Sequence, residues 1–238
     1  MNPYQKLLSR KRKWTPVQTT AGSVQSGAEE TLHRVIALRH MELPVGDFIT
    51  DALTTDVPEL ARELLLSNVK DEENHDVALG FLANAYGVDD KAEREALKLR
   101  EAWTSHPDHT ILKAMVAERA IFFVLLPFLR FNGDAGMRTV SADISRDEQV
   151  HVSANSLVCR ELGLTYSPSL DKLRKATINW VMEPLGTNTT SQYLDKKFWL
   201  DSSDRLMYEG KAPQLSETRS ARMPAFFEHS NVNLPQYA

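Results

Sequence analysis

The stretches Glu72-Glu73-Asn74-His75 and Glu148-Gln149-Val150-His151 repeat one pattern, Glu-x-x-His, in two distant parts of the chain. A further glutamate, Glu42 or Glu118, stands thirty residues before each of them. In an α-helix the side chains at i and i+3 lie on one face, so each Glu-x-x-His can aim a carboxylate and an imidazole at the same point. Two such sets supply the ligands that a carboxylate-bridged pair of metal ions takes in a four-helix bundle.

The thirty-residue spacing has a simple helical interpretation. A helix, a short turn and an antiparallel return of about fifteen residues, at roughly 1.5 Å per residue, bring both groups to the same depth. One Glu-x-x-His alone is more often a charged helix face in water. The recurrence at equal spacing is what favours a metal site.

The apolar neighbours of these residues at helical spacing predict that they are buried. A buried ionised carboxylate is costly unless a cation pairs with it, so four such glutamates call for a shared counter-charge. The alternative is that the helices are rotated and show the glutamates to solvent or to Arg39, Arg119 and Arg146. The apolar neighbours are Leu32, Val35, Leu38, Val45 and Ile49 for Glu42; Leu65, Leu79 and Leu82 for Glu72 and His75; Ile111, Met115, Phe122 and Leu125 for Glu118; and Val140, Ile144 and Val158 for Glu148 and His151.

Composition sets the broad class. A chain of 238 residues with 42% apolar content is long enough for one domain with a sizeable core. The net charge of −4 does not indicate a nucleic-acid-binding protein, and no apolar stretch is long enough to span a membrane. The single Cys159 excludes an internal disulfide and suits a reducing cytoplasm, which is the expected location. We expect a flexible basic segment over 1–25, with Ser9–Lys13 as a solvated patch, and a single helical domain over 26–238.

Hydrophobic periodicity predicts helices almost throughout and no sheet. Thr54–Pro58 is a stop and restart, with Asp56 as N-cap and Pro58 at the first helical position. Pro44 and Pro127 fall inside predicted helices, where they should kink the helix or remove a backbone hydrogen bond. The predicted helices are 27–53, 58–86, 90–103, 108–131, 136–162, 168–184, 189–209 and 215–228.

Two of these segments resemble a known family. Glu118–Phe123 and Ile144-Ser145-Arg146-Asp147-Glu148-Gln149-Val150-His151 look like the third and fourth ligand helices of the ribonucleotide reductase small subunit, which carries Ile-Ser-Arg-Asp-Glu-x-x-His in the fourth. Val57–Leu60 before Glu72 is similar to its second ligand helix, and Phe226–Glu228 before Tyr237 to its closing helix. The close match covers about forty residues of the chain and the weaker ones about forty more.

The resemblance implies an all-α, ferritin-like four-helix bundle over about 27–162, with accessory helices over 168–228, in a homodimer. It implies two metal ions, with iron favoured and manganese or a mixed Mn/Fe pair as alternatives. The implied metal ligands are Glu42, Glu72, His75, Glu118, Glu148 and His151. Asp147 would hydrogen-bond a ligand histidine and join an electron-transfer path, a role that also follows because metal-bound imidazoles usually donate their second N–H to a carboxylate.

The departures from the family bear on function. Leu79 stands one turn after His75, where the family carries the tyrosine that becomes a radical. The chain stops at Tyr237-Ala238, so the docking tail for a large subunit is expected to be absent. The first ligand is Glu42, where many small subunits have aspartate.

Three functions therefore stay open. The first is an O₂-activating di-metal oxidase or oxygenase that acts on a small organic substrate, which Leu79 favours. The second is a genuine radical-generating reductase small subunit, with a large subunit as partner. The third and least favoured is ferritin-like metal storage.

Two structural features would separate the first two functions. A substrate oxidase needs space beside Leu79, Phe122 and Ile144. A closed site with a hydrogen-bonded route from a ligand histidine through Asp147 to a tryptophan near the surface would favour the reductase subunit. The candidate tryptophans are Trp14, Trp103, Trp180 and Trp199, and the sequence does not choose among them.

Overall fold

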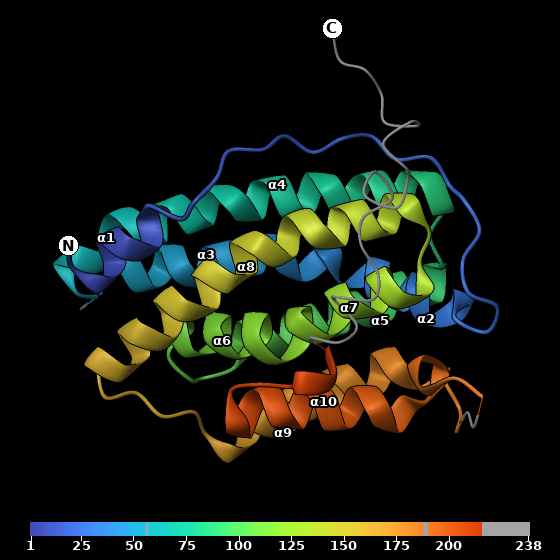
Figure 1. Cartoon of the computed structure of the whole chain (residues 1–238). Helices are drawn as coiled ribbons and strands as arrows, with labels where there is room; N and C mark the ends of the chain where they lie inside the picture. The colour runs from blue at the N-terminus through green and yellow to red at the C-terminus, as the bar shows by residue number, and fades with distance from the viewer. Residues whose placement is uncertain (56, 188–189, 216–238) are drawn as a thin grey trace, which may run out of the picture.

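The computed structural model describes residues 1–55, 57–187 and 190–215, and every regular element in these ranges is a helix. Four long helical stretches form the bundle (Figure 1). They are α3 (Glu42–Leu53), α4 (Arg62–Tyr86), α6 (Thr110–Ala117) continued by α7 (Phe123–Asn132), and α8 (Ala135–Glu161). The pairs α3–α4, α3–α6, α4–α8 and α7–α8 lie side by side. The predicted all-α bundle is confirmed.

The first predicted helix, 27–53, is divided in the structure. It consists of α2 (Glu29–Ala37), the 3₁₀ turn η1 (Leu38–Met41) and α3. Pro44 has no N–H to donate to the carbonyl of His40, so an unbroken helix would lack that bond. The division places Pro44 in the first turn of α3, where a missing N–H costs nothing. It also places Glu42 at the first position of α3.

The third bundle helix contains a π-helical turn, η3 (Glu118–Phe122), between α6 and α7. The sequence predicts one continuous helix over 108–131 and gives no sign of this turn. Pro127 lies within α7, as expected. Single π turns inside α-helices are rare and occur mostly at functional sites. Here the turn begins at Glu118.

Several helix ends follow the expected chemistry. Asp89 caps α5 (Asp90–Ser105), and Asp134 caps α8 by accepting from the Met137 N–H at 3.0 Å. Gly87 and Gly163 follow α4 and α8 with φ of 78° and 65°, a conformation that glycine adopts without strain. The 3₁₀ turn η2 (Glu59–Ala61) precedes α4.

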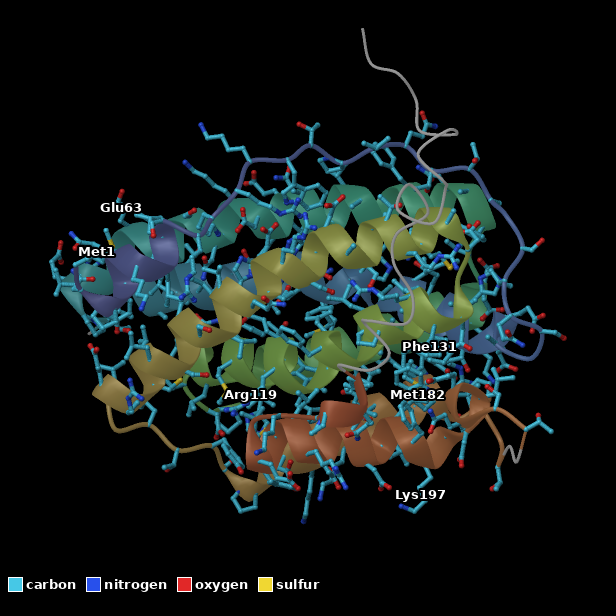
Figure 2. All side chains as sticks on the ribbon, in the orientation of Figure 1. Met1, Glu63, Arg119, Phe131, Met182 and Lys197 are labelled. Carbon is cyan, nitrogen blue, oxygen red and sulfur yellow. The ribbon has the colours of Figure 1, made fainter. Side chains whose placement is uncertain are left out.

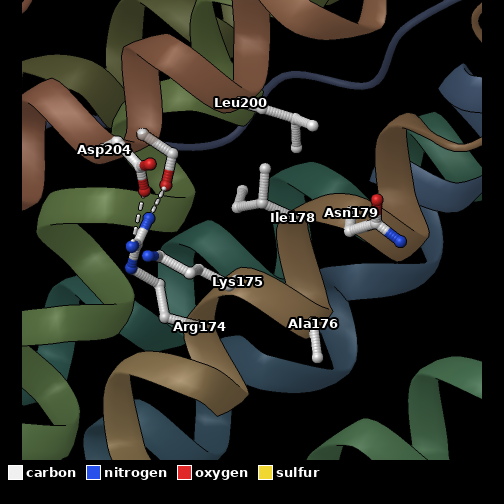
Figure 3. A pocket seen from close by; sticks show the side chains of 8 residues that line it. Arg174, Lys175, Ala176, Ile178, Asn179, Leu200 and Asp204 are labelled. Carbon is white, nitrogen blue, oxygen red and sulfur yellow. Dashed lines mark hydrogen bonds and ion pairs between the residues drawn. The ribbon is translucent and has the colours of Figure 1, made fainter. Parts of the chain in front are cut away.

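Two accessory helices cover the bundle: α9 (Pro168–Met182) and α10 (Lys196–Glu209). The predicted helix over 189–209 begins too early, because the 3₁₀ turn η4 (Gln192–Leu194) and the capping residue Asp195 come before α10. The buried Arg174 of α9 joins the pair by donating to Ser203 and Asp204 of α10, each at 2.7 Å (Figure 3). Side chains fill the space between this pair and the bundle (Figure 2).

Some predictions fall outside the described residues. These are Asp56 as a helix N-cap, most of the predicted helix 215–228, and the resemblance at Phe226–Glu228 and Tyr237. The division into a 1–25 segment and one domain over 26–238 stays a prediction. No helix among the described residues is long and apolar enough to cross a membrane.

The N-terminal segment lies against the bundle. It begins with α1 (Pro3–Leu8), whose N-terminus is closed by reciprocal hydrogen bonds between Asn2 and Gln5. An extended stretch then runs along the bundle past α4 and α8 (Figure 1). Lys11 and Arg12 form ion pairs with Asp71 of α4 and Asp143 of α8. The expectation of a solvated basic patch over Ser9–Lys13 is therefore wrong for these two residues.

Candidate metal centre

The bundle brings all six predicted ligands into one buried cluster. Glu42 comes from the start of α3, Glu118 from η3, and the two Glu-x-x-His pairs from the middle of α4 and α8. All six side chains are at most 1% exposed, so the alternative of glutamates turned to solvent is wrong. Two groups have ligand atoms within 4.8 Å of one another: Glu42, Glu72, His75 and Glu148 in one, and Glu72, Glu118 and His151 in the other.

The distances assign different positions to the four glutamates. Glu72 points Oε2 at Nδ1 of His75, 3.3 Å away, and Oε1 at Nδ1 of His151, 3.0 Å away. Glu148 does the same, with Oε1 at 3.5 Å from His75 and Oε2 at 3.9 Å from His151. Both carboxylates therefore span the two histidines, as bridging ligands do.

The other two glutamates each serve one side. Glu42 Oε2 lies 3.6 Å from Nδ1 of His75, and Glu118 Oε1 lies 3.8 Å from Nδ1 of His151. The imidazole rings are 5.6 Å apart between centroids. The cluster thus has two half-sites, each with one histidine and one terminal glutamate. Glu72 belongs to both groups of ligand atoms, and Glu148, which belongs to the His75 group, also reaches within 3.9 Å of His151.

The hydrogen-bonding state of the cluster fits a pair of cations. Both carboxylate oxygens of Glu42, Glu72 and Glu148, one of Glu118, and Nδ1 of both histidines are buried with no hydrogen-bond partner. Buried polar atoms are almost always hydrogen-bonded, and burying a charge without a partner is costly. Carboxylate oxygens and imidazole nitrogens are ligands that iron and manganese accept. These residues could hold metal ions.

Without cations the glutamates compete for protons. Burial raises the pKa of Glu42 and of Glu118 from 4.5 to about 8, and it raises the pKa of Glu148 well above its usual value. Burial opposes ionisation of Glu72 as well, but the nearby charge of His151, whose Nδ1 lies 3.0 Å from Glu72 Oε1, holds the Glu72 pKa below its usual range. The bridging position of Glu72 is therefore anionic in the metal-free cluster.

The histidine pKa values shift in the opposite direction to what burial alone would give. Burial disfavours the imidazolium, yet the nearby carboxylates of Asp147, Glu42 and Glu72 raise the pKa of His75 well above its usual value. Likewise the charge of Glu72 and the hydrogen bond to Asp71 raise the pKa of His151 to about 10. Two divalent ions would replace the protons that the metal-free cluster retains.

An aspartate faces the outer nitrogen of each histidine. His75 Nε2 lies 3.4 Å from Asp147 Oδ2, and His151 Nε2 lies 2.9 Å from Asp71 Oδ2. An Nε2–H that donates to these carboxylates leaves Nδ1 free to bind a metal. Asp147 was predicted for this role, whereas Asp71 was not. Both motifs read Asp-Glu-x-x-His, and the aspartate of each holds the histidine of the other.

Three N-terminal side chains complete this outer layer, and the sequence did not predict them as a group. Trp14 donates its indole N–H to Asp147 Oδ2 at 2.5 Å and stacks near His75, with ring centroids 6.2 Å apart. Arg12 approaches the other oxygen of Asp147 at 3.9 Å. Lys11 pairs with Asp71 and donates to Asn68 Oδ1 at 3.0 Å. Trp14 is partly exposed, so it joins the cluster to the surface.

The remaining tryptophans are bound elsewhere. Trp103 donates to Thr177, Trp180 to Glu95, and Trp199 to the Tyr193 carbonyl. Of the four candidates, Trp14 is the one that contacts Asp147.

The other histidines have separate roles in the structure. His40 pairs with Glu93, His106 with Ser169, and His109 accepts from the Ile111 N–H at the start of α6. His33 shares no metal-capable group with the cluster, and His229 lies outside the described residues.

The three positions where an oxidase would need space are buried. Leu79 is 4% exposed, Phe122 is 3% and Ile144 is fully buried, all within the apolar core. A cavity of about 310 Å³ does reach the cluster, but at Glu72, and it is lined by residues of η1, α3 and α4 and by Arg100 of α5.

No protein-family model matches this chain, no curated protein matches it, and no solved structure matches it.

Proposed function

We propose that this protein is a di-metal carboxylate oxidoreductase that activates O₂, built like the small subunit of ribonucleotide reductase. The observation that carries the proposal is the pair of half-sites that both Glu72 and Glu148 reach. A single-metal site would have no use for two carboxylates that each face both histidines. Iron is the favoured metal, with manganese or a mixed pair as alternatives.

The chain's own residues would divide the work as follows. Glu72 and Glu148 would bridge the ions, while Glu42 and Glu118 would each bind one. Asp71 and Asp147 hold the outer N–H of the histidines, which orients Nδ1 inward. Asn155 donates to Glu118 Oε2 at 2.7 Å and leaves the second oxygen free for metal.

The buried wall that includes Leu79, Phe122 and Ile144 keeps bulk water from the cluster. Two reduced metal ions would supply the electrons for O₂ reduction and the oxidising equivalent that follows from it.

The structure offers a path along which the oxidising equivalent could pass from the metals to the protein surface. His75, Asp147 and the partly exposed Trp14 form a chain of hydrogen bonds from the cluster outward. This arrangement supports the reductase-subunit function over the oxidase function. Because Leu79 has no phenol, the equivalent would be stored on the metals themselves or on Trp14.

One observation keeps oxidation of a small substrate as the second candidate: the cavity of about 310 Å³ that reaches Glu72. Storage is the least favoured, since a bonded route from a ligand to the surface has no purpose in a metal store.

Metal analysis tests the proposal itself. Protein supplied with Fe²⁺ and Mn²⁺ should bind two ions per chain, and the Glu148→Ala variant should bind none while it keeps its helical circular dichroism. A folded wild-type protein that binds no metal would refute the di-metal assignment.

The Trp14→Phe variant separates the two functions. Phenylalanine keeps the aromatic contact with His75 but has no N–H for Asp147 and is not readily oxidised. If Trp14 relays electrons, the variant should bind both ions normally but should consume external reductant during the O₂ reaction at least tenfold more slowly. An unchanged rate would favour the substrate-oxidase function. A long-lived tyrosyl radical in electron paramagnetic resonance would contradict the proposal that the oxidising equivalent is held on the metals or on Trp14.

A further inference from the structure

The cavity at Glu72 lies where α3 lacks a side chain. Gly46 faces α4, and a Cβ added there would lie 3.5 Å from Cβ and 3.6 Å from Cγ of Glu72. A glycine inside a helix costs about 1 kcal/mol relative to alanine. What the glycine provides here is space beside the Glu72 side chain, and a longer side chain would occupy that space.

Glu72 is the most buried of the polar and charged residues that line the cavity, and it belongs to the metal-capable cluster. Glu72 is 1% exposed, lines the cavity, and neither of its oxygens has a hydrogen-bond partner. A group that binds there must bring positive charge or several donors. This observation is independent of the charge at the cavity mouth.

The mouth of the cavity is acidic. Asp47 of α3 and Glu73 and Asp76 of α4 line it, and the first two are exposed. Arg39 and His40 also line the cavity, but Glu93 binds both, at 2.6 Å and 2.7 Å, and offsets their charge. Arg100 is the remaining cation of the lining, against three outer carboxylates and Glu72. A cleft of one charge sign raises the local concentration and arrival rate of the opposite sign, by factors of about 10 to 1,000.

We propose that this cavity is the route by which hydrated divalent metal ions reach the cluster, with Gly46 as the residue that keeps it open. The outer carboxylates attract the ion, and Glu72, which lines the cavity, is the first ligand that it meets. The cavity has room for an ion with six waters at roughly 30 Å³ each. This inference rests on the proposed di-metal function and adds where the metals come in.

The test is the rate of metal uptake, measured separately from the amount bound. Metal-free protein is mixed with Co²⁺ in a stopped-flow instrument, and the visible absorption of the bound ion is followed. The Gly46→Leu variant should take up Co²⁺ at least tenfold more slowly than the Gly46→Ala variant, and both should reach two ions per chain. Alanine controls for the loss of glycine, because its Cβ meets Glu72 only at ordinary contact distances.

A charge variant tests the same route without a change in packing. Glu73→Gln with Asp76→Asn should slow uptake about tenfold at low ionic strength, and the difference should shrink in salt. The matched control is Glu101→Gln with Glu209→Gln, which removes the same charge from exposed positions that do not line the cavity. This pair should stay within twofold of the wild-type rate.

The outcomes separate the inference from the function on which it rests. Wild-type protein that takes up no Co²⁺ at any time would refute the di-metal proposal. Normal final occupancy with equal rates in the leucine and alanine variants, or equal rates in the two charge pairs, would refute the route. Uptake that is unaffected by leucine while turnover of an added organic compound is lost would instead identify the cavity as a substrate site.

Discussion

Asp71 offers the sharpest test of how the outer layer controls the metals. Replacing it with asparagine keeps the shape of the side chain and an oxygen that can accept from His151, but it removes the negative charge. A charged acceptor makes the imidazole more basic at Nδ1, so the variant should bind the metal at the His151 half-site more weakly. The Lys11 ammonium would also lose its ion-pair partner.

The structure sets the expected size of the effect. Loss of a partner that holds a ligand histidine typically lowers metal affinity by about 10- to 100-fold, or roughly 1.4 to 2.8 kcal/mol. The Asp71–His151 bond is 2.9 Å long, a normal hydrogen bond, whereas the Asp147–His75 distance is 3.4 Å. We therefore expect a loss near 100-fold for Asp71→Asn and nearer tenfold for Asp147→Asn, each at one of the two metals.

Competition between the protein and a chelator for Mn²⁺ would measure both affinities. Asp90→Asn is the control, since it removes the same charge from an exposed residue at the start of α5. Wild-type affinity at both metals in Asp71→Asn, or a larger loss in Asp147→Asn, would refute the reasoning from these distances.

Three further predictions concern the same cluster. Lys11→Met should lower the free energy of unfolding by about 2 kcal/mol in urea titrations, because Lys11 and Asp71 are only 10% and 11% exposed and a nearly buried carboxylate would lose its cation; a change below 0.5 kcal/mol would contradict this. Glu118→Ala should lower the affinity of the His151 half-site at least 100-fold by chelator competition and leave the helical content unchanged, and full metal occupancy would remove Glu118 from the ligands. The metal-free protein should lose stability as the pH rises from about 5 to 8, by roughly 1.4 kcal/mol per pH unit for each group that is protonated in the folded state only. Glu42 and Glu118 are two such groups, because their folded-state pKa is raised from 4.5 to about 8, and the raised pKa of Glu148 adds to the effect. Thermal unfolding with and without Mn²⁺ should show the gain from metal growing over the same range.

The six buried residues could be predicted because each obeys a local rule. The i, i+3 spacing joins Glu72 to His75 and Glu148 to His151 on a helix face, and apolar neighbours mark those faces as buried. Asp71 could also have been predicted, because it precedes Glu72 as Asp147 precedes Glu148. The resemblance directed attention to Asp147 alone.

No local sequence rule predicts the contacts that Lys11 and Trp14 make with the bundle. Lys11 meets Asp71 across 60 positions of sequence and Trp14 meets Asp147 across 133, both from an extended stretch without periodicity. A basic run followed by a tryptophan looks the same whether it is solvated or bound. The contacts of this segment depend on Asp71 and Asp147, which only the folded bundle brings next to it.

The sequence indicates some of the interruptions within the helices and not others. Pro44 gave a physical reason for the interruption before α3, though not its form as a 3₁₀ turn. The start of α10 was placed too early because the apolar pattern does not distinguish η4 from a helical turn. Nothing in the residues of η3 distinguishes a π turn from an α turn, since both use the same side chains.

The π-helical turn makes this chain sensitive to length at one place. A π turn holds one residue more than an α turn, and each residue of a helix corresponds to a rotation of about 100°. Residues 111–117 before the turn and 124–132 after it are all buried, so both segments are packed on every side. Deleting any one residue from Glu118–Phe122 would rotate α6 and α7 relative to each other and force the buried side chains of one of them against new neighbours, whereas one deletion in the extended segment at residues 15–21 would leave every helix in phase. Gene variants that differ by one codon in η3 should therefore be selected against far more strongly than variants at the loops.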